Sequence, residues 1–402
     1  MYHRLLGLVL MLGMGACVQP ASHAAPKQPD IPKTQVYVLG MLHDRHHDSD
    51  SWGLKQVRET IQNLDPDVVC VEIPPDRWPA AQALWTAEQR IEDDRILKFP
   101  EYVEVLMPLM NTMDFEVEPC AAWSSFMADA RNAKLDAFRS EEEYAEAHAS
   151  YKADTAWVRA WSEATAPDYA DDNPLYLHSP QFDLRTKSEL GPYASHLTPV
   201  IGRPGGWTYI NESHYTLIDI AIRKHAGKRI LVTFGAGHKH WFLEQLRYRD
   251  DVELMDVRPY LATGEEYAPS PESAVRDAFL DGIDLLQVWW AIERGDSSLA
   301  WERLQERLRL EDQDAFFAEL RSNKGRHEDE FRDGPFLGAI EFAGNIGPAW
   351  RLRVAVKRLG EVGADSEWIE AVLLPDASVP GGYAWLELNL PDWLRSWEMR
   401  QQ

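Results

Sequence analysis

One stretch of this sequence decides the fold: residues 36–75 read VYVLGMLHDRHHDSDSWGLKQVRETIQNLDPDVVCVEIPP. Residues 36–39 form a short apolar run rich in β-formers, and residues 68–71 form a second one. Between the two runs, residues 54–64 carry apolar side chains at helical spacing. A strand, a helix and a strand within so short a stretch predict a βαβ unit, and hence a parallel sheet with helices on both faces.

The same alternation continues further along the chain. Short apolar runs at residues 115–118 and 229–234 predict further strands of this sheet. We therefore assign residues 36–266 to an α/β domain, mainly a parallel sheet flanked by helices, with a helical insertion at about residues 121–206. The last part of the insertion, residues 174–206, has no clear period, which favours a long functional loop.

The remainder of the chain differs in kind. Residues from about 271 to 330 have a helical pattern, and from residue 334 the apolar residues alternate with a period of two. This change predicts that residues 271–402 form a separate, smaller helical plus β C-terminal module, to which the sequence assigns no function.

The N-terminus has the features of an export signal. Arg4 is followed by an apolar run that is too short to span a bilayer. Two processing sites compete: the segment MGAC, which resembles a lipobox and would leave a lipidated Cys17, and the segment SHA, which ends at Ala24. We assign residues 1–25 to the signal or lipoprotein peptide and residues 26–35 to a tether. Both alternatives predict an exported bacterial envelope protein, either periplasmic or lipid-anchored.

Composition and charge exclude several classes of partner. The 65 acidic residues against 41 basic ones give a net charge of −24, which argues against binding of nucleic acid or of anionic lipid. We expect a small-molecule or peptide substrate and contact with a membrane only through a lipid anchor. Three cysteines exclude a disulfide scaffold, and Cys70 and Cys120 could either pair or remain buried thiols. The sequence leaves the oligomeric state open.

Polar residues with metal-binding or catalytic chemistry lie just beyond the predicted strands. His43, Glu72, Glu118 and His238 each end or follow such a strand. The carboxyl ends of parallel strands share one rim, where ligands of open α/β sheets bind. Two histidines and a carboxylate suit a divalent cation with an open position for water. We predict that His43, Glu72 and His238 bind this metal, that Glu72 ligates it or acts as general base, and that Glu118 assists.

Glycines accompany both histidines. His43 closes a Gly-x-x-His motif that begins at Gly40, and His238 closes Gly-x-Gly-His with Gly235 and Gly237. The second motif is rare by chance in a chain with 24 glycines and 13 histidines. Glycines at a strand-to-helix switch permit a tight turn and close approach of a ligand, so we assign all three to the binding site.

Other polar residues near these motifs have structural alternatives. Asn211 either contributes to the binding site or caps the helix that it opens. His46 and His47 lie in a polar loop that we expect to be solvated, and the alternative is that one of the two completes the site. His240 should point away from His238 to the surface.

The order of these motifs resembles the TraB/TIKI/erythromycin-esterase superfamily, and more narrowly an exported bacterial branch of it. The resemblance covers about Val36 to Leu261. It implies a parallel α/β core, a site at His43, Glu72 and His238, and an activity such as metal-dependent proteolysis, ester hydrolysis or haem binding. Many relatives have an Arg-Asn pair in the late helix. This chain has Ile210-Asn211 instead, so the arginine is missing or replaced, for example by Arg223 or Arg258.

The sequence therefore predicts an exported, metal-dependent hydrolase of an amide or ester bond with a His/Glu/His site. The alternative is an envelope protein that binds haem or a metal without turnover. A serine nucleophile is disfavoured because the chain has no Gly-x-Ser-x-Gly motif.

Overall fold

The computed structural model describes residues 32–164, 172–202, 205–264, 267–290, 297–323, 336–357 and 367–391. The predicted signal peptide, both candidate processing sites and most of the tether lie outside the described residues. Among the described residues, no helix is both long enough and apolar enough to cross a lipid bilayer.

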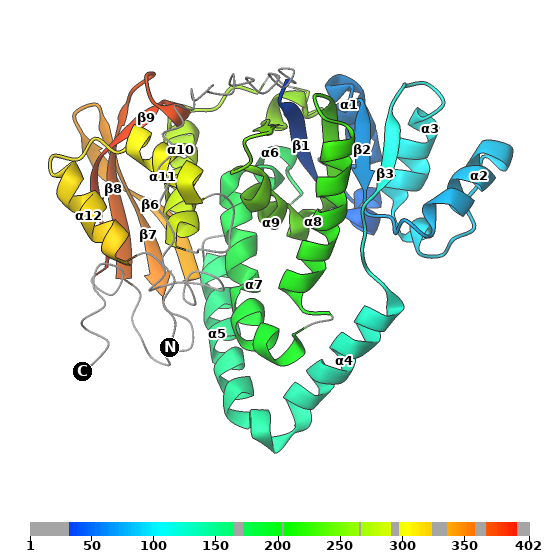
Figure 1. The fold of residues 1–402 in the computed structure, drawn as a ribbon, viewed down its shortest axis with the longest axis horizontal. Coiled ribbons are helices and arrows are strands. Elements are labelled where there is room, and N and C mark those ends of the chain that lie inside the picture. Colours follow the sequence, from blue (N-terminus) through cyan, green and yellow to red (C-terminus); the bar gives the residue numbers. More distant parts are fainter. Residues whose placement is uncertain are drawn as a thin grey trace, which may run out of the picture. The chain divides into compact units, whose positions relative to one another are not determined.

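The first sheet has five parallel strands in the order β3-β2-β4-β1-β5 (Figure 1). The strands are β1 (Thr34–Met41), β2 (Val68–Val71), β3 (Glu116–Pro119), β4 (Arg229–Gly235) and β5 (Val252–Leu254). This sheet confirms the predicted α/β fold. Its order places β2, β4 and β1 next to one another, so their carboxyl ends form the middle of one edge.

Helices cover both faces of this sheet, as the unbroken apolar runs of its central strands predict. On one face, Tyr37 and Leu39 of β1 belong to the apolar cluster that includes α1, and on the other, Val36 and Val38 belong to the cluster of α8 and α9. The helices around the sheet are α1 (Leu54–Leu64), α2 (Trp78–Glu88), α3 (Met107–Leu109), α8 (Trp207–Lys224) and α9 (Ala236–Leu246). Short turns are η1 (His43–His47), η2 (Ile96–Lys98), the π-helical η3 (Glu101–Leu106), η4 (Glu142–Tyr144), η5 (Arg258–Tyr260) and η6 (Pro380–Gly382).

The described part of the insertion is mainly helical, which confirms the predicted helical insertion, but residues 174–206 are not the long loop that the sequence predicts. Its helices are α4 (Ser125–Ser140), α5 (Ala145–Ala164), α6 (Pro174–Leu177) and α7 (Pro180–Ile201). Ser179 caps the N-terminus of α7, where its hydroxyl accepts the Phe182 N–H, and the helix contains Pro192 and Pro199. The loop prediction was wrong because α7 packs against helices on several sides, namely α4, α5, α9 and α10. A helix with several packed faces has no single apolar stripe.

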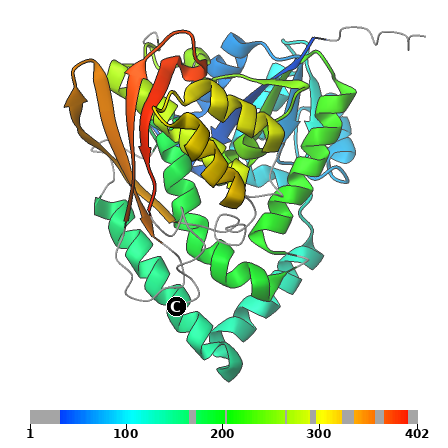
Figure 2. The ribbon, with the colours of Figure 1, turned by 60° about the vertical axis from the view of Figure 1, so that its left-hand side comes forward.

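The described residues of the C-terminal part form three helices and a four-stranded antiparallel sheet of order β6-β7-β8-β9 (Figure 2). Its elements are α10 (Pro271–Trp290), α11 (Ser297–Arg307), α12 (Gln313–Asn323), β6 (Phe336–Ile346), β7 (Ala349–Lys357), β8 (Glu367–Pro375) and β9 (Tyr383–Asn389). The predicted helical plus β composition is therefore confirmed.

Side chains of the α/β part and of the C-terminal part share one apolar cluster. Leu184 of α7 and Tyr248, which follows α9, belong to the cluster that contains Val275 and Phe279 of α10. Arg247 also forms ion pairs with carboxylates of α10. Whether residues 271–402 fold independently of the α/β domain stays a prediction.

Candidate active site

The strand register brings two of the predicted site residues together. Met41 of β1 lies beside Gly235 of β4, which is the last residue of that strand. His43 and Glu72 follow the ends of β1 and β2, on either side of β4. The His43 Nε2 atom lies 3.6 Å from Glu72 Oε2, and the two side chains are 29% and 9% exposed. The site is thus reachable from solvent at the imidazole, while the carboxylate is largely buried.

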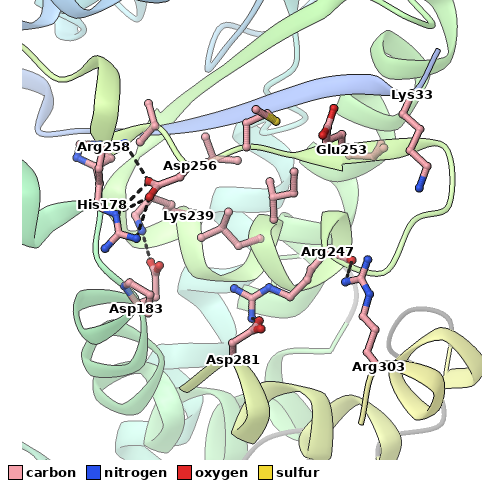
Figure 3. Close-up of a pocket in the computed structure, with 17 residues that line it drawn as sticks. Lys33, His178, Asp183, Lys239, Arg247, Glu253, Asp256, Arg258, Asp281 and Arg303 are labelled. Atoms are coloured by element: carbon pink, nitrogen blue, oxygen red, sulfur yellow. Dashed lines mark hydrogen bonds and ion pairs between the residues drawn. The ribbon is translucent and has the colours of Figure 1, made fainter. Parts of the chain in front are cut away.

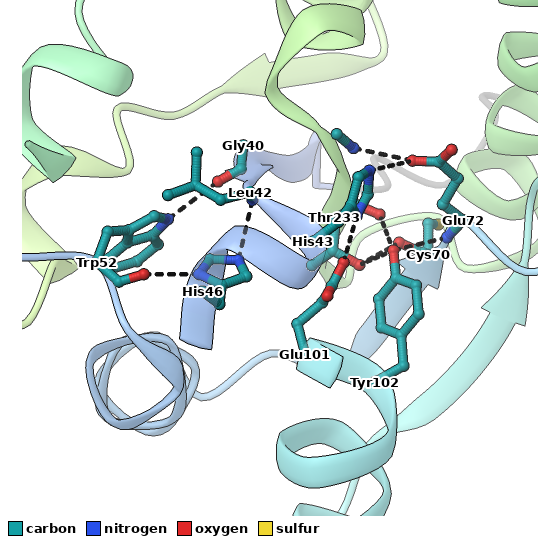
Figure 4. Close-up of polar contacts among 11 residues, drawn as sticks. Gly40, Leu42, His43, His46, Trp52, Cys70, Glu72, Glu101, Tyr102 and Thr233 are labelled. Carbon is teal, nitrogen blue, oxygen red and sulfur yellow. Dashed lines mark hydrogen bonds and ion pairs between the residues drawn. The ribbon is translucent and has the colours of Figure 1, made fainter. Parts of the chain in front are cut away.

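A second carboxylate holds the other side of the His43 ring. His43 Nδ1 lies 2.7 Å from Glu101 Oε1, and the Glu101 side chain is fully buried (Figure 4). Burial on its own lowers the pKa of His43, but the Glu101 hydrogen bond and the charges of Glu72 and Glu101 outweigh it and raise this pKa above its ordinary value. Glu101 Oε2 is buried and has no hydrogen-bond partner among the described residues.

The backbone at His43 is also unusual. Its φ angle is +56°, in the left-handed region that non-glycine residues seldom adopt. Such conformations concentrate at functional sites, where the surrounding structure maintains them. Here the Phe99 ring packs edge-on against the His43 imidazole, with 4.8 Å between the ring centroids. Glu101 holds the imidazole through the hydrogen bond to His43 Nδ1.

The π-helical turn that supplies Glu101 also supplies Tyr102, which joins the ends of two strands. The buried Tyr102 hydroxyl accepts the Glu72 N–H at 2.8 Å and donates to the Thr233 carbonyl at 2.6 Å (Figure 4). It therefore positions the backbone from which Glu72 projects. π-turns are rare in proteins and are frequent at functional sites.

Gly235 is the glycine that the site requires. Its N–H donates to Glu72 Oε2 at 2.9 Å, and a Cβ at this position would lie 2.6 Å from His43 Nε2. A Cβ on Gly237 would meet nothing within 4 Å, and one on Gly40 would meet Ala236 at 3.1 Å. The close approach that the sequence predicts for these glycines is therefore strongest at Gly235.

We expect Gly235→Ala to lower turnover by roughly 10–100-fold, because a displaced imidazole loses its catalytic geometry. Gly237→Ala is the matched control, since it adds the same methyl group into open space on the same segment. Steady-state kinetics and thermal unfolding of both variants make the comparison. Equal activity of the two would mean that His43 does not need the space above Gly235.

His238 forms the second part of the site on α9. Its Nδ1 lies 2.7 Å from Asn211 Oδ1, and the Asn211 amide donates to the Trp207 carbonyl at 2.9 Å. Because the amide orientation is fixed in this way, His238 Nδ1 carries the proton and Nε2 is left as an acceptor. Burial, and secondarily the charge of His43, lower the pKa of His238 to about 4, so the ring is neutral. Trp207 stacks on it at 4.8 Å.

Asn211 therefore has a different role from the capping alternative. It lies inside α8, which begins at Trp207, and is fully buried. His214, one turn further along, accepts the Ala122 N–H at Nδ1 over 2.8 Å and contacts the His238 ring edge-on. Burial, the first cause, lowers the pKa of His214 to about 3, so this ring too is neutral.

The predicted metal-binding set is not a close group. Among the described residues, only Glu116, Glu118 and His225 form a set of three whose ligand atoms all lie within 4.8 Å of one another. His43, Glu72 and His238 have suitable donor atoms, but their spacing does not fit a shared ion in this structure. Metal binding by these three stays a prediction.

Glu118 lies in a different environment from the one its predicted role requires. It contacts Lys224 at 2.5 Å and His225 at 2.8 Å, at the end of α8 remote from Asn211. Burial acts to raise the pKa of Glu118, but hydrogen bonds from His225 and Lys224 lower it overall. These contacts give Glu118 a structural ion pair, and its assistance in catalysis stays a prediction.

Two further histidines differ from their predicted surroundings. His46 is 2% exposed, because the tight η1 turn folds it back to accept the Leu42 N–H and to contact the Trp52 carbonyl (Figure 4). The solvated loop predicted for it was wrong, although His47 is exposed beside Glu104. His240, predicted at the surface, is buried because helices pack on both sides of α9.

A cavity of about 650 Å³ lies apart from this site and is lined by ion pairs (Figure 3). Arg258, one of its lining residues, is bound to Asp256 and Asp277. Arg223, outside the cavity, pairs with Asp219. Both arginines thus have carboxylate partners, and whether either replaces the arginine that the resemblance implies stays a prediction.

Comparisons of the chain with family models, curated proteins and solved structures give no match. The relation to the TraB/TIKI/erythromycin-esterase superfamily therefore stays a prediction from the spacing of its motifs.

The structure adds Glu101 and Tyr102, which the sequence analysis does not single out. The sequence gives one sign of Glu101: it is an acidic residue between Phe99 and Tyr102, which are both buried and apolar. Its complete burial is the signal that the structure supplies.

Proposed function

We propose that the protein is a hydrolase of an ester or amide bond in which His43 acts as general base toward a water molecule. The observation that carries this proposal is the hydrogen bond between His43 Nδ1 and the fully buried Glu101. A carboxylate behind one imidazole nitrogen orients the ring and stabilises its protonated form, as hydrolytic enzymes of several folds require.

In the proposed reaction Glu101, His43 and Glu72 each have a separate role. Glu101 accepts a hydrogen bond from the Nδ1–H of His43, so that the Nε2 lone pair faces Glu72 and solvent. His43 takes the proton of the attacking water and returns it to the leaving oxygen or nitrogen. Glu72, held by the Gly235 N–H, accepts the second hydrogen of that water and so orients it. The raised pKa of His43 makes it a stronger base.

The alternative, a haem- or metal-binding protein without turnover, is favoured by one observation. His238 is neutral and has its Nδ1 anchored to Asn211, the arrangement in which histidine Nε2 binds metals. Location in the bacterial envelope, periplasmic or anchored at Cys17, is part of both proposals.

Turnover assays on the purified mature protein test the proposal. The substrates are a panel of aryl esters and short peptides, and the protein is assayed as purified, after dialysis against EDTA, and after addition of Zn²⁺ or Mn²⁺. We expect ester turnover that survives chelation. Turnover restored only by a metal would favour the metal-dependent form, and a Soret band without turnover would favour haem binding.

A further inference from the structure

One cation near His43, the Arg95 guanidinium, forms no ion pair with the residues that the structure describes. Arg95 precedes η2 and is half-buried, and no carboxylate in the described part of the chain lies within 4.0 Å of its guanidinium. Its guanidinium carbon lies 5.1 Å from the centroid of the Phe99 ring, which in turn packs against the His43 ring. Its charge also acts to lower the pKa of both His43 and His214.

One acidic residue close to Arg95 in sequence, Asp93, has other partners. Asp93 Oδ1 accepts the backbone N–H groups of Arg95 and Ile96, at 2.9 and 3.1 Å. Its other oxygen binds Arg77 at 2.8 Å. Asp93 thus fixes the backbone at Arg95 without neutralising its side chain. Neighbouring Arg90, in contrast, contacts both Glu88 and Glu92.

Arg95 lies near the proposed general base His43 and has no ion-pair partner among the described residues. This is unexpected in a chain whose net charge is −24. Such a protein repels anions at long range, so an anionic substrate requires a local cation. The planar guanidinium binds carboxylates through two parallel hydrogen bonds and stacks on aromatic rings, as Arg95 does on Phe99.

We propose that Arg95 binds a carboxylate of the substrate and that the protein therefore prefers esters or amides with a carboxylate close to the scissile bond. This inference rests on the proposed hydrolase function and names its substrate class. Arg95 determines substrate specificity, because it holds the anionic end of the substrate while His43 and Glu72 face the bond to be cleaved.

A pair of matched esters, phenyl acetate and 3-carboxyphenyl acetate, tests the preference. For each protein the ratio of kcat/KM for the carboxylated ester to that for the neutral ester is measured. We expect Arg95→Gln to lower this ratio by roughly 10–100-fold, mainly through KM, because a charge-assisted bidentate contact is lost. Arg95→Lys should give an intermediate ratio, since it keeps the charge but not the planar fork.

Arg90→Gln is the matched control, because it removes the same charge from a nearby exposed arginine. It should leave the ratio unchanged. An unaltered ratio in Arg95→Gln, or an equal fall in Arg90→Gln, would overturn the proposal, because the effect would be absent or due to overall charge.

A binding experiment separates this inference from the hydrolase proposal. If the wild-type protein cleaves neither ester, the proposed function fails, and calorimetric titration with glutarate still tests Arg95. We expect glutarate to bind the wild-type protein and to bind Arg95→Gln at least tenfold more weakly. Equal binding, or tighter binding of inorganic phosphate than of glutarate, would contradict the carboxylate assignment.

Discussion

Replacing His43 with asparagine should lower kcat for ester hydrolysis by about 10²–10⁴-fold, the usual contribution of a positioned general base. Asparagine is the appropriate replacement because it tolerates the positive φ that this position adopts. Glu101→Gln should cause a loss in the same range. Its amide can donate to Nδ1 and so leave the proton on Nε2, the wrong tautomer for a base.

The double variant distinguishes a shared role from two independent ones. Because Glu101 acts through His43, the pair of substitutions should be no worse than His43→Asn alone. Glu101→Gln should also move the acidic limb of the kcat profile to lower pH. The base is active above its pKa, and this substitution removes a cause that raises the pKa of His43.

Glu104→Gln provides the control on the same π-turn, since Glu104 is exposed beside His47 and should affect kcat little. Additive losses in the double variant, or activity of Glu101→Gln near that of the wild type, would assign Glu101 to the fold and not to catalysis.

The largest expected effect on stability comes from Asp183→Asn. The carboxylate of Asp183 pairs with Lys239 of α9, whose side chain is 2% exposed (Figure 3). Burial lowers the pKa of Lys239 and raises that of Asp183, because it disfavours the charged form of each group. The interaction between the two charges offsets this desolvation cost. Removing one partner should lower the free energy of unfolding by about 3–5 kcal/mol, because a buried charge remains.

Removing both charges tests this reading. The double variant Asp183→Leu with Lys239→Met should be more stable than Asp183→Leu alone or Lys239→Met alone, because it leaves neither charge of the pair buried without its partner. As control, Glu59→Gln breaks the exposed pair of Glu59 with Lys55 and should change stability by less than about 1 kcal/mol. Urea unfolding measures all of these variants. A loss below about 1 kcal/mol in Asp183→Asn would show that Lys239 is not dependent on its partner.

The sequence was sufficient to predict the sheet and the edge on which the site lies. Apolar runs at β1, β2 and β4 reveal buried parallel strands, and the rule that their carboxyl ends share an edge brings His43 to Glu72 and Gly235. These predictions depend only on local pattern and on one property of parallel sheets.

The remaining contacts depend on helix placement, which local pattern does not specify. Asn211 reaches His238 because α8 begins earlier than its polar residues indicate. Glu101 reaches His43 from a π-helical turn, and the local apolar pattern does not specify such a turn. The prolines of α7 concealed a long helix in the same way, since the helix is held by neighbours on several sides and not by its own propensity.

The π-turn has a consequence for the evolutionary history of such a site. A π-turn closes over one more residue than an α-turn, so the loss of a single residue from Glu101–Leu106 would restore an ordinary α-helix. The apolar side chains of that helix could still cover the sheet, but Glu101 would be rotated away from His43. A one-residue insertion or deletion would thus separate a chain that has the contact between Glu101 and His43 from one that lacks it.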